Sequence, residues 1–527
     1  MKPYADTSRR ARAAVTVAAF GMALAFGLYR VGHRDLWIDE TFTVVDARRS
    51  LADMLAMVRP DGTRMPHTPL AYLVTRATLP FCGDDEACLR LPFVAAYAGV
   101  AAVSLRLGWA LFGLGAGVCG AALWTLSAYV LKHTHEVRFY SLFALLVLAT
   151  LAGTVRCLGL DGRPPTARLR TWALTGVAAA AAIWCHVFAA LWLVGIAAWA
   201  AAYQLVAARR GSAALRGGRL GWAVAAAAFA VAVAPLLPGL LGHFDGDGSR
   251  YARFSWKPVK NWVSVAKDVV RTTLKSNIVP ALVAAGVVAL PGAARARLAA
   301  VVAIALFPLV PFTLVTPEHF LTVRYFMPSI ALGLLAAGAG MAGLAALPGR
   351  LAARAGSGTP ARVVAVVLGA AIVAWPAAGI GRLYAKDLRA YWANPGGEPW
   401  RQVRDYLRRH ARDGDALIVT PYELVRFPFE VYAPPLAPLD DREEDVSRRI
   451  DARGFGRVWT IASHYGTPER RERYERLQRR LDGDYRRVGL PSPRIRTGSI
   501  QMTLYERRPP AEPDQEPAAP RPRGRRR

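Results

Sequence analysis

The sequence predicts a polytopic α-helical membrane protein that ends in a small soluble α/β domain. Of the 527 residues, 53% are hydrophobic and only 20% are charged, a composition too apolar for a single soluble core. Apolar runs of about 20 residues, the length that crosses a bilayer, recur from residue 13 to residue 383. Beyond them, charged residues and short apolar patterns alternate. We therefore expect a transmembrane domain at 1–383 and a soluble domain at 384–508.

Eleven apolar runs predict membrane-spanning helices. Basic residues precede the first run, and no small-residue cleavage site with a polar mature region follows it. We therefore expect an uncleaved first span rather than a signal peptide. The eleven spans are expected at about 13–31, 91–109, 111–131, 139–157, 172–185, 187–206, 222–241, 277–292, 298–315, 325–347 and 363–381.

The arginines indicate the topology of the chain. The net charge is +29, but the arginines form short clusters between apolar runs rather than one basic face, so we expect no nucleic-acid partner. With the N-terminus in the cytosol, as the positive-inside rule requires, the inner loops are rich in arginine, and the acids, histidines and most tyrosines fall outside. This topology predicts a protein of the cell (inner or plasma) membrane, with a large outer loop at 32–90 and an extracytoplasmic C-terminal domain.

The C-terminal region is expected to alternate helices and strands. Strands are expected at 416–420, 457–463 and about 500–506, and helices at about 399–408 and 469–481. The last residues, 509–527, are rich in proline, glutamate and arginine and predict a disordered basic tail. The chain has no repeat of fixed period, P-loop, dinucleotide fingerprint or zinc-ligand spacing, which argues against ATP-driven transport and nicotinamide chemistry.

Candidate functional residues gather on the predicted outer face. Asp39 and Glu40 directly follow the first span, where a carboxylate is costly unless it is paired or functional. The prolines beside His67 bias its backbone toward an extended or turn form, which would present the imidazole at the mouth of the bundle. The other candidates are Glu136, Arg138 and Tyr140 before the fourth span, His186 between the fifth and sixth, and His319, Arg324 and Tyr325 before the tenth.

Carboxylates beside cationic side chains at one membrane face suit a particular chemistry. A base must reach the hydroxyl or amine of an acceptor. The negative charge that develops on a departing phosphate needs fixed positive donors. A phosphate carried by a lipid would also explain why such a site lies at the membrane surface. These residues therefore favour group transfer from a lipid-linked phosphate.

Six short motifs occur in order along the chain. They are Leu36–Glu40, His67–Tyr72, Arg90–Pro92, Glu136–Tyr140, the single His186, and Val323–Tyr325. As an ordered set they resemble the motifs of the GT-C membrane glycosyltransferases and, within that fold, the protein mannosyltransferase and aminoarabinose-transferase group. The likeness covers about residues 13–383. The family's His-Pro-Pro pattern is His-Thr-Pro in this chain, which leaves the geometry of that loop open.

The resemblance implies a glycosyltransferase with a polyprenyl-phosphate donor that works on the extracytoplasmic face. It further implies direct displacement of a hexosyl or pentosyl group, with inversion at the anomeric carbon, and a protein, lipid or cell-envelope glycan as acceptor. Asp39 matches the essential acid of the family's first loop. The implied catalytic residues are Asp39, Glu40 and Glu136, and the residues implied to bind donor phosphate or sugar are His67, Arg138, Tyr140, His186, Arg324 and Tyr325.

Three alternatives stay open. A transporter or flippase of lipid-linked saccharides would carry charges along a path through the spans, whereas here the charges gather at one face. Asp39 with His319 forms the weak alternative of a divalent metal site, although no cofactor is firmly implied. Cys82 and Cys88 flank a polar stretch of the first outer loop, where an oxidising compartment permits a disulfide.

Overall fold

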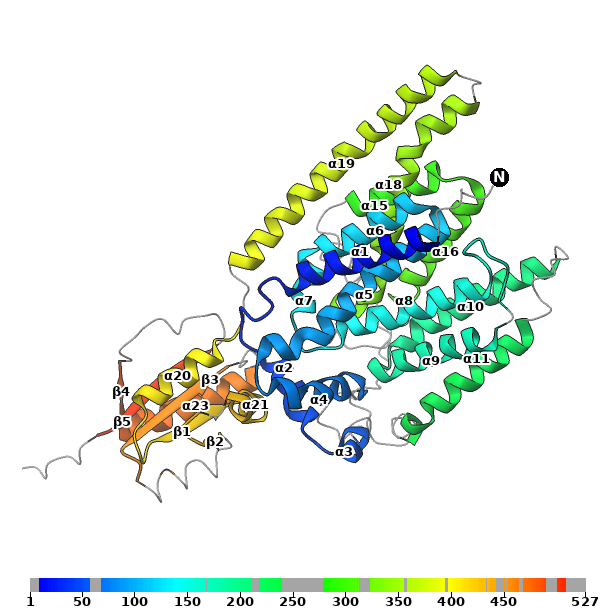
Figure 1. The fold of residues 1–527 in the computed structure, drawn as a ribbon. Coiled ribbons are helices and arrows are strands. Elements are labelled where there is room, and N and C mark those ends of the chain that lie inside the picture. The colour runs from blue at the N-terminus through cyan, green and yellow to red at the C-terminus, as the bar shows by residue number, and fades with distance from the viewer. Residues whose placement is uncertain are drawn as a thin grey trace, which may run out of the picture. The chain divides into compact units, whose positions relative to one another are not determined.

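The computed structural model divides into two compact units (Figure 1). The helical unit comprises Met1–Arg34 and Phe42–Gly396, and the C-terminal unit comprises Asp35–Thr41 and Gly397–Arg527. The predicted basic tail at 509–527 lies outside the residues that the structure describes. Those described residues are 9–56, 68–166, 168–209, 218–238, 278–309, 311, 323–354, 358–393, 397–432, 434–441, 450, 454–463, 468–489 and 500–508.

The helical unit is built from helices along its described length. Long apolar segments form them because a helix satisfies all its backbone hydrogen bonds within the segment. The helices are α1 (Arg9–Leu28), α3 (Leu51–Ala56), α4 (Leu70–Cys82), α5 (Glu86–Phe112), α6 (Leu114–Leu126), α7 (Ala128–Thr134), α8 (Tyr140–Cys157), α9 (Leu169–Cys185), α10 (Ala189–Arg209), α11 (Gly218–Val233), η2 (Ala234–Leu236), α15 (Ile278–Ala289), α16 (Gly292–Leu306), η4 (Val323–Phe326), α18 (Met327–Arg354) and α19 (Thr359–Ala393).

Each of the eleven predicted spans overlies one of these helices or, at 111–131, the α6–α7 pair. Among the described residues, seven helices are long and apolar enough to cross a membrane, or eight if the α6–α7 pair is one broken span. Three of the predicted spans, at 172–185, 277–292 and 298–315, coincide with the shorter helices α9, α15 and α16, which have 17, 12 and 15 described residues.

The break between α6 and α7 has a local cause. The two helices are bent by 62° at Ser127, which has extended backbone angles and whose hydroxyl accepts a hydrogen bond from the Val130 backbone N–H. Serine at this position caps the new helix α7. The predicted straight span at 111–131 is therefore two helices, and the second leads directly into the loop that carries Glu136 and Arg138.

Small residues bring the central helices of this unit together. A Cβ atom added at Gly108 of α5 would lie 2.5 Å from Cα of Gly117 in α6, and one added at Gly338 of α18 would lie 2.5 Å from the backbone N of Gly120 in α6. Such close approach replaces side-chain burial as the source of packing between membrane helices. Accordingly, α6 lies against both α5 and α18 (Figure 1).

The C-terminal unit contains a five-stranded mixed sheet with strand order β2-β1-β3-β5-β4. In it, β1 runs parallel to β2 and β3, whereas β5 is antiparallel to β3 and β4. The predicted helices and strands are present, but α21, β2 and β4 were not predicted. The elements are α20 (Trp400–His410), β1 (Ala416–Thr420), α21 (Tyr422–Tyr432), β2 (Pro438–Asp440), β3 (Arg457–Ala462), α23 (Pro468–Asp484), β4 (Tyr485–Val488) and β5 (Gln501–Arg507).

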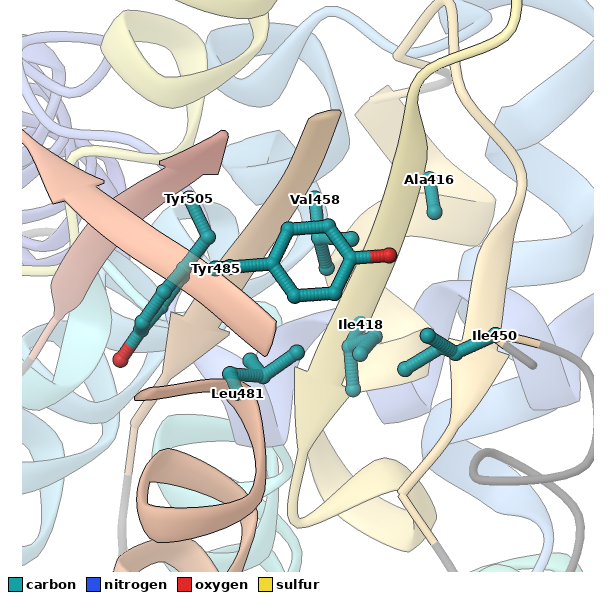
Figure 2. Close-up of a cluster of buried hydrophobic side chains, with 7 residues drawn as sticks. All are labelled: Ala416, Ile418, Ile450, Val458, Leu481, Tyr485 and Tyr505. Atoms are coloured by element: carbon teal, nitrogen blue, oxygen red, sulfur yellow. The ribbon is translucent and has the colours of Figure 1, made fainter. Parts of the chain in front are cut away.

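Both faces of this sheet are covered. Figure 2 shows the cluster on one face, where Ile418, Val458 and Tyr505 of the strands meet Leu481 of α23. On the other face Trp459 of β3 packs edge-on against Tyr406 of α20, with ring centroids 6.1 Å apart. All five residues of β1 are buried, as expected for a central parallel strand.

One further helix, α2 (Ile38–Ala47), follows the first span. Its first turn, with Asp39 and Glu40, packs as part of the C-terminal unit, and its later residues belong to the helical unit. The segment Asp35–Thr41 is therefore a component of the C-terminal unit although it precedes most of the helical unit in sequence.

Candidate active site

A buried ion cluster lies in the loop between α7 and α8 of the helical unit. Glu136 is 2% exposed, and its Oε1 lies 3.1 Å from His133 Nδ1 and 3.5 Å from Arg34 Nη2. Arg34 is itself fixed by donating to the His135 carbonyl at 2.6 Å. Burial opposes ionisation, but His133, Arg34 and Arg324 outweigh it and lower the pKa of Glu136 to about 2. Glu136 is thus a fixed negative charge, and a carboxylate with so low a pKa is a poor general base.

A small pocket opens beside this cluster in the helical unit. Arg138 lines it and donates from Nη1 to Thr43 Oγ1 at 3.2 Å. Thr68 also lines it, is 5% exposed, and its hydroxyl has no hydrogen-bond partner among the described residues. An unsatisfied buried hydroxyl costs about 1–3 kcal/mol, so a polar ligand atom would be stabilising there. The lining residues are Thr43, Thr68, Ala71, Tyr72, Arg138, Phe139, Cys185 and His186.

His186 forms the end of α9 at this pocket. Its Nδ1 accepts a hydrogen bond from the Phe188 backbone N–H at 3.2 Å. The neutral imidazole therefore carries its proton on Nε2, where it acts as a donor. Extended backbone angles at His186 end α9, which explains why this residue is a boundary and not part of the apolar helix face.

Aromatic side chains form one wall of the site. Phe139 stacks on Tyr325 with ring centroids 6.1 Å apart, and His186 lies 4.6 Å from the Phe139 ring. The Arg324 guanidinium lies 5.8 Å from the Tyr140 ring centroid, within the range of a cation–π contact. Ring contacts and cation–π contacts through Phe139 and Tyr140 thus connect five predicted site residues: Arg138, Tyr140, His186, Arg324 and Tyr325.

The predicted acidic pair lies in the C-terminal unit, on the first turn of α2. Glu40 is fully buried, and its Oε2 accepts a hydrogen bond from the Trp37 backbone N–H at 3.1 Å. This bond closes the first turn in the manner of a capping box. Asp39 precedes it and is partly exposed. The two adjacent acids therefore differ in setting, because one is buried in the helix cap and the other is accessible.

Other predicted residues are placed as follows. Cys82 and Cys88 form a disulfide with an S–S distance of 2.02 Å. Among the described residues, no group of three or more histidines, cysteines, aspartates and glutamates is arranged to hold a metal ion. His67 and His319 lie outside the described residues.

Sequence reasoning missed three residues that the structure adds to this region. The exposed fractions of Arg34, Thr43 and Thr68 are 7%, 1% and 5%. Arginine and threonine are common in surface loops, so the residue types alone do not indicate this burial. A signal existed only for Thr68, which lies within the His67–Tyr72 motif. Nothing local marks Thr43, or Arg34 among the seven arginines of residues 32–90, because their roles depend on contacts with distant segments.

Comparison with known proteins bears on the fold. No protein-family model and no curated protein matches the sequence. Among solved structures, the archaeal oligosaccharyltransferase AglB from Archaeoglobus fulgidus, in complex with an inhibitory peptide and a dolichol-phosphate, aligns with a TM-score of 0.44 and 10% identity. That alignment covers 95% of this chain and 75% of AglB.

The similarity to ArnT from Cupriavidus metallidurans is higher. Its apo structure aligns with a TM-score of 0.55 and 16% identity, over 94% of this chain and 98% of ArnT. Its structure bound to undecaprenyl phosphate aligns with a TM-score of 0.54, at the same identity and coverage. This agreement extends over nearly the whole of both chains and confirms the predicted fold class. The chain is a multi-pass membrane protein with the GT-C fold.

Proposed function

We propose that the protein is a membrane glycosyltransferase that moves a sugar from a polyprenyl-phosphate donor to an acceptor outside the cytosol. The observation that carries the proposal is the pocket of the helical unit, in which Arg138, His186 and the unsatisfied Thr68 hydroxyl offer donors to one anionic group. A guanidinium matches the geometry of phosphate oxygens. The shared fold with ArnT, which has been solved with undecaprenyl phosphate bound, supports this choice of ligand.

The neighbouring buried groups suit the sugar that the phosphate carries. Glu136 Oε2 and the Tyr140 hydroxyl are buried and have no hydrogen-bond partner among the described residues. The carboxylate oxygen would accept a hydrogen bond from a sugar hydroxyl, and the phenol would donate or accept one. In this role Glu136 orients the donor, and its low pKa keeps it an acceptor throughout the reaction.

Asp39 is proposed as the general base. In the reaction the acceptor oxygen or nitrogen forms a bond to the anomeric carbon as the bond from that carbon to the phosphate oxygen breaks. The polyprenyl phosphate leaves with the bonding electrons, the acceptor proton passes to Asp39, and the anomeric carbon inverts. Asp39 lies on the first turn of α2 and is partly exposed, as a base that must reach an acceptor requires. Glu40 serves to cap the helix.

The test is transfer by the purified full-length protein in detergent, with a panel of labelled polyprenyl-phosphate sugars. Asp39→Asn is expected to lower kcat by about 100- to 10,000-fold, the range for loss of a general base. Glu472→Gln makes the same kind of change on the exposed side of α23 and serves as the matched control. Equal transfer by the wild type and Asp39→Asn would remove Asp39 from the mechanism. Translocation of lipid-linked saccharides across vesicles without transfer would favour a flippase.

A further inference from the structure

The segment that carries Asp39 is held by three side chains of the C-terminal unit. The Leu36 backbone N–H donates to the Tyr432 hydroxyl at 2.7 Å. The Arg401 backbone N–H donates to Asp35 Oδ2 at 2.7 Å, and the Arg401 guanidinium pairs with the same carboxylate. The Ile38 backbone N–H, at the start of α2, donates to Glu398 Oε2 at 3.2 Å. Glu398 therefore acts at the helix turn that includes Asp39.

Glu398 has unusual surroundings for a carboxyl group. It is 5% exposed, and the same Oε2 also accepts a hydrogen bond from Trp400 Nε1 at 2.6 Å. Asp39 and Glu40 on α2 are charged groups that face it, and the guanidinium of Arg401 on α20 pairs with Asp35. Burial raises the pKa of Glu398, the hydrogen bonds from Trp400 and Ile38 oppose this in part, and Asp39 and Glu40 add a smaller upward effect, so that the pKa is raised to about 7.

We propose that Glu398 is a positioning residue for Asp39. As a neutral carboxylic acid, Glu398 holds the N-terminus of α2 without adding a third negative charge. With the proton on Oε1, Oε2 remains a carbonyl oxygen that accepts both N–H donors. The partial positive charge of a helix N-terminus, about half an elementary charge, does not compensate three carboxylates. The inference rests on the proposed role of Asp39 and gives the C-terminal unit a part in the catalytic machinery.

Ionisation of Glu398 has a defined consequence for the reaction. Above about pH 7 a third negative charge appears at the turn that carries Asp39, and its repulsion of Asp39 and Glu40 disturbs that turn. The expected effect is a fall in kcat/KM with rising pH, because Asp39 is no longer held in position. Glu398→Gln keeps an amide oxygen for both N–H donors and carries no proton to lose, so it should remain active and lack this alkaline fall.

The first experiment needs no turnover. Infrared difference spectra of the full-length protein in detergent are recorded between about pH 5 and pH 9 for the wild type, Glu398→Gln and the control Glu472→Gln. The carbonyl band of a protonated carboxylic acid should disappear with a midpoint near pH 7 in the wild type and in Glu472→Gln, and should be missing from Glu398→Gln. A wild-type spectrum without this band, or an unchanged band in Glu398→Gln, overturns the neutral state of Glu398.

The second experiment measures positioning by hydrogen exchange of peptides that cover residues 35–41. Glu398→Gln should match the wild type, and Glu398→Ala should exchange about tenfold faster, since loss of one such hydrogen bond costs about 1.4 kcal/mol. Equal protection in all three proteins overturns the positioning role. If both experiments succeed but no donor supports transfer, the proposed glycosyltransferase function fails while the contact stands. An alkaline fall that persists in Glu398→Gln overturns the link to catalysis.

Discussion

Glu136 of the helical unit and Glu398 of the C-terminal unit are both almost fully buried, yet their pKa values move in opposite directions. Burial alone would raise both. Around Glu136, His133, Arg34 and Arg324 overcome that effect and lower the pKa to about 2. Around Glu398 burial has the largest effect, the hydrogen bonds from Trp400 and Ile38 oppose it, Asp39 and Glu40 reinforce it, and the pKa rises to about 7. The cations around Glu136 therefore reverse the effect of burial, so Glu136 is a fixed anion, whereas Glu398 is protonated below about pH 7.

This difference divides two tasks between the units. A fixed anion can hold a guanidinium and an imidazole in place and still accept a hydrogen bond from a sugar. A neutral acid can clamp the start of a helix without adding charge beside Asp39. An ionised Glu398 would add that charge, and a neutral Glu136 would remove the ion pair with Arg34 while Arg34 still donates to the His135 carbonyl.

The largest effect is expected from removing the cation beside Glu136. Arg34→Met should destabilise the full-length protein by about 3–5 kcal/mol, since breaking a buried ion pair leaves an uncompensated charge. Thermal unfolding in detergent measures the loss. The double variant Arg34→Met/Glu136→Gln should recover part of it because the buried carboxylate without its partner is also removed. A wild-type melting temperature for Arg34→Met would show that His133 and Arg324 compensate Glu136 without Arg34.

The next effect is a pH dependence that belongs to Glu398. A folded-state pKa of about 7 against the ordinary 4.5 means that this group stabilises the fold fully below about pH 4.5 and that the contribution is lost as pH rises to about 7. At about 1.4 kcal/mol for each pH unit the loss is about 3 kcal/mol. Across this range the free energy of unfolding of the wild type should fall by about 3 kcal/mol more than that of Glu398→Gln. Parallel curves would contradict it.

The pH dependence of stability expected from Glu136 has the opposite sign and lies at lower pH. Its lowered pKa means that its stabilising contribution is present above about pH 4.5 and is lost as pH falls toward about 2. Glu136→Gln should therefore flatten the acid limb of the stability curve and leave the region between pH 5 and pH 7 unchanged. A change in that neutral region would mean that Glu136 also titrates there.

Asp441 should show an intermediate case in the C-terminal unit. Its burial raises its pKa, while hydrogen bonds from the Thr420 hydroxyl and the Tyr422 backbone N–H lower it. Its carboxylate lies 3.6 Å from the guanidinium of Arg473, which also forms an ion pair with Glu423. Arg473→Met is expected to cost about 1–2 kcal/mol, between the exposed and buried limits. A loss as large as that expected for Arg34→Met would show that Asp441, like Glu136, depends on its cationic partner as a fully buried carboxylate does.

The smallest effect is expected at an exposed pair of the helical unit. Arg48 and Asp84 are 2.6 Å apart, but their side chains are 41% and 55% exposed. Arg48→Ala should change the free energy of unfolding by at most about 1 kcal/mol, and salt should weaken the effect further. A larger loss would show that proximity rather than burial governs ion pairs in this protein.

Much of the fold was predictable because its signals are local. Each long apolar run overlies a helix, and the apolar segments at 416–420 and 457–463 became β1 and β3. The bend at Ser127 was not predicted, because one polar residue within an apolar run looks the same in a straight helix. Helix α21 was also missed, since it contains Pro428, which normally argues against a helix interior.

The candidate site was predictable only in part. Arg138, Tyr140 and His186 stand out as polar or charged residues beside apolar runs, which is a signal in sequence. Glu398 carries no such signal, because its partner Ile38 is 360 residues away. The distinction between Asp39 and Glu40 also needed structure, since only the hydrogen bond to Trp37 shows which acid caps the helix.

The inclusion of Asp35–Thr41 in the C-terminal unit has a consequence for the timing of biosynthesis. Ile38 leaves the ribosome 360 residues before Glu398, which at typical rates of synthesis is a delay of roughly 20–70 s. Throughout that interval the turn with Asp39 lacks its partners from the end of the chain. The nascent protein would therefore be inserted in the membrane well before the turn with Asp39 has these partners, and on the proposed role of Asp39 a chain that stops short of Glu398 would remain inactive.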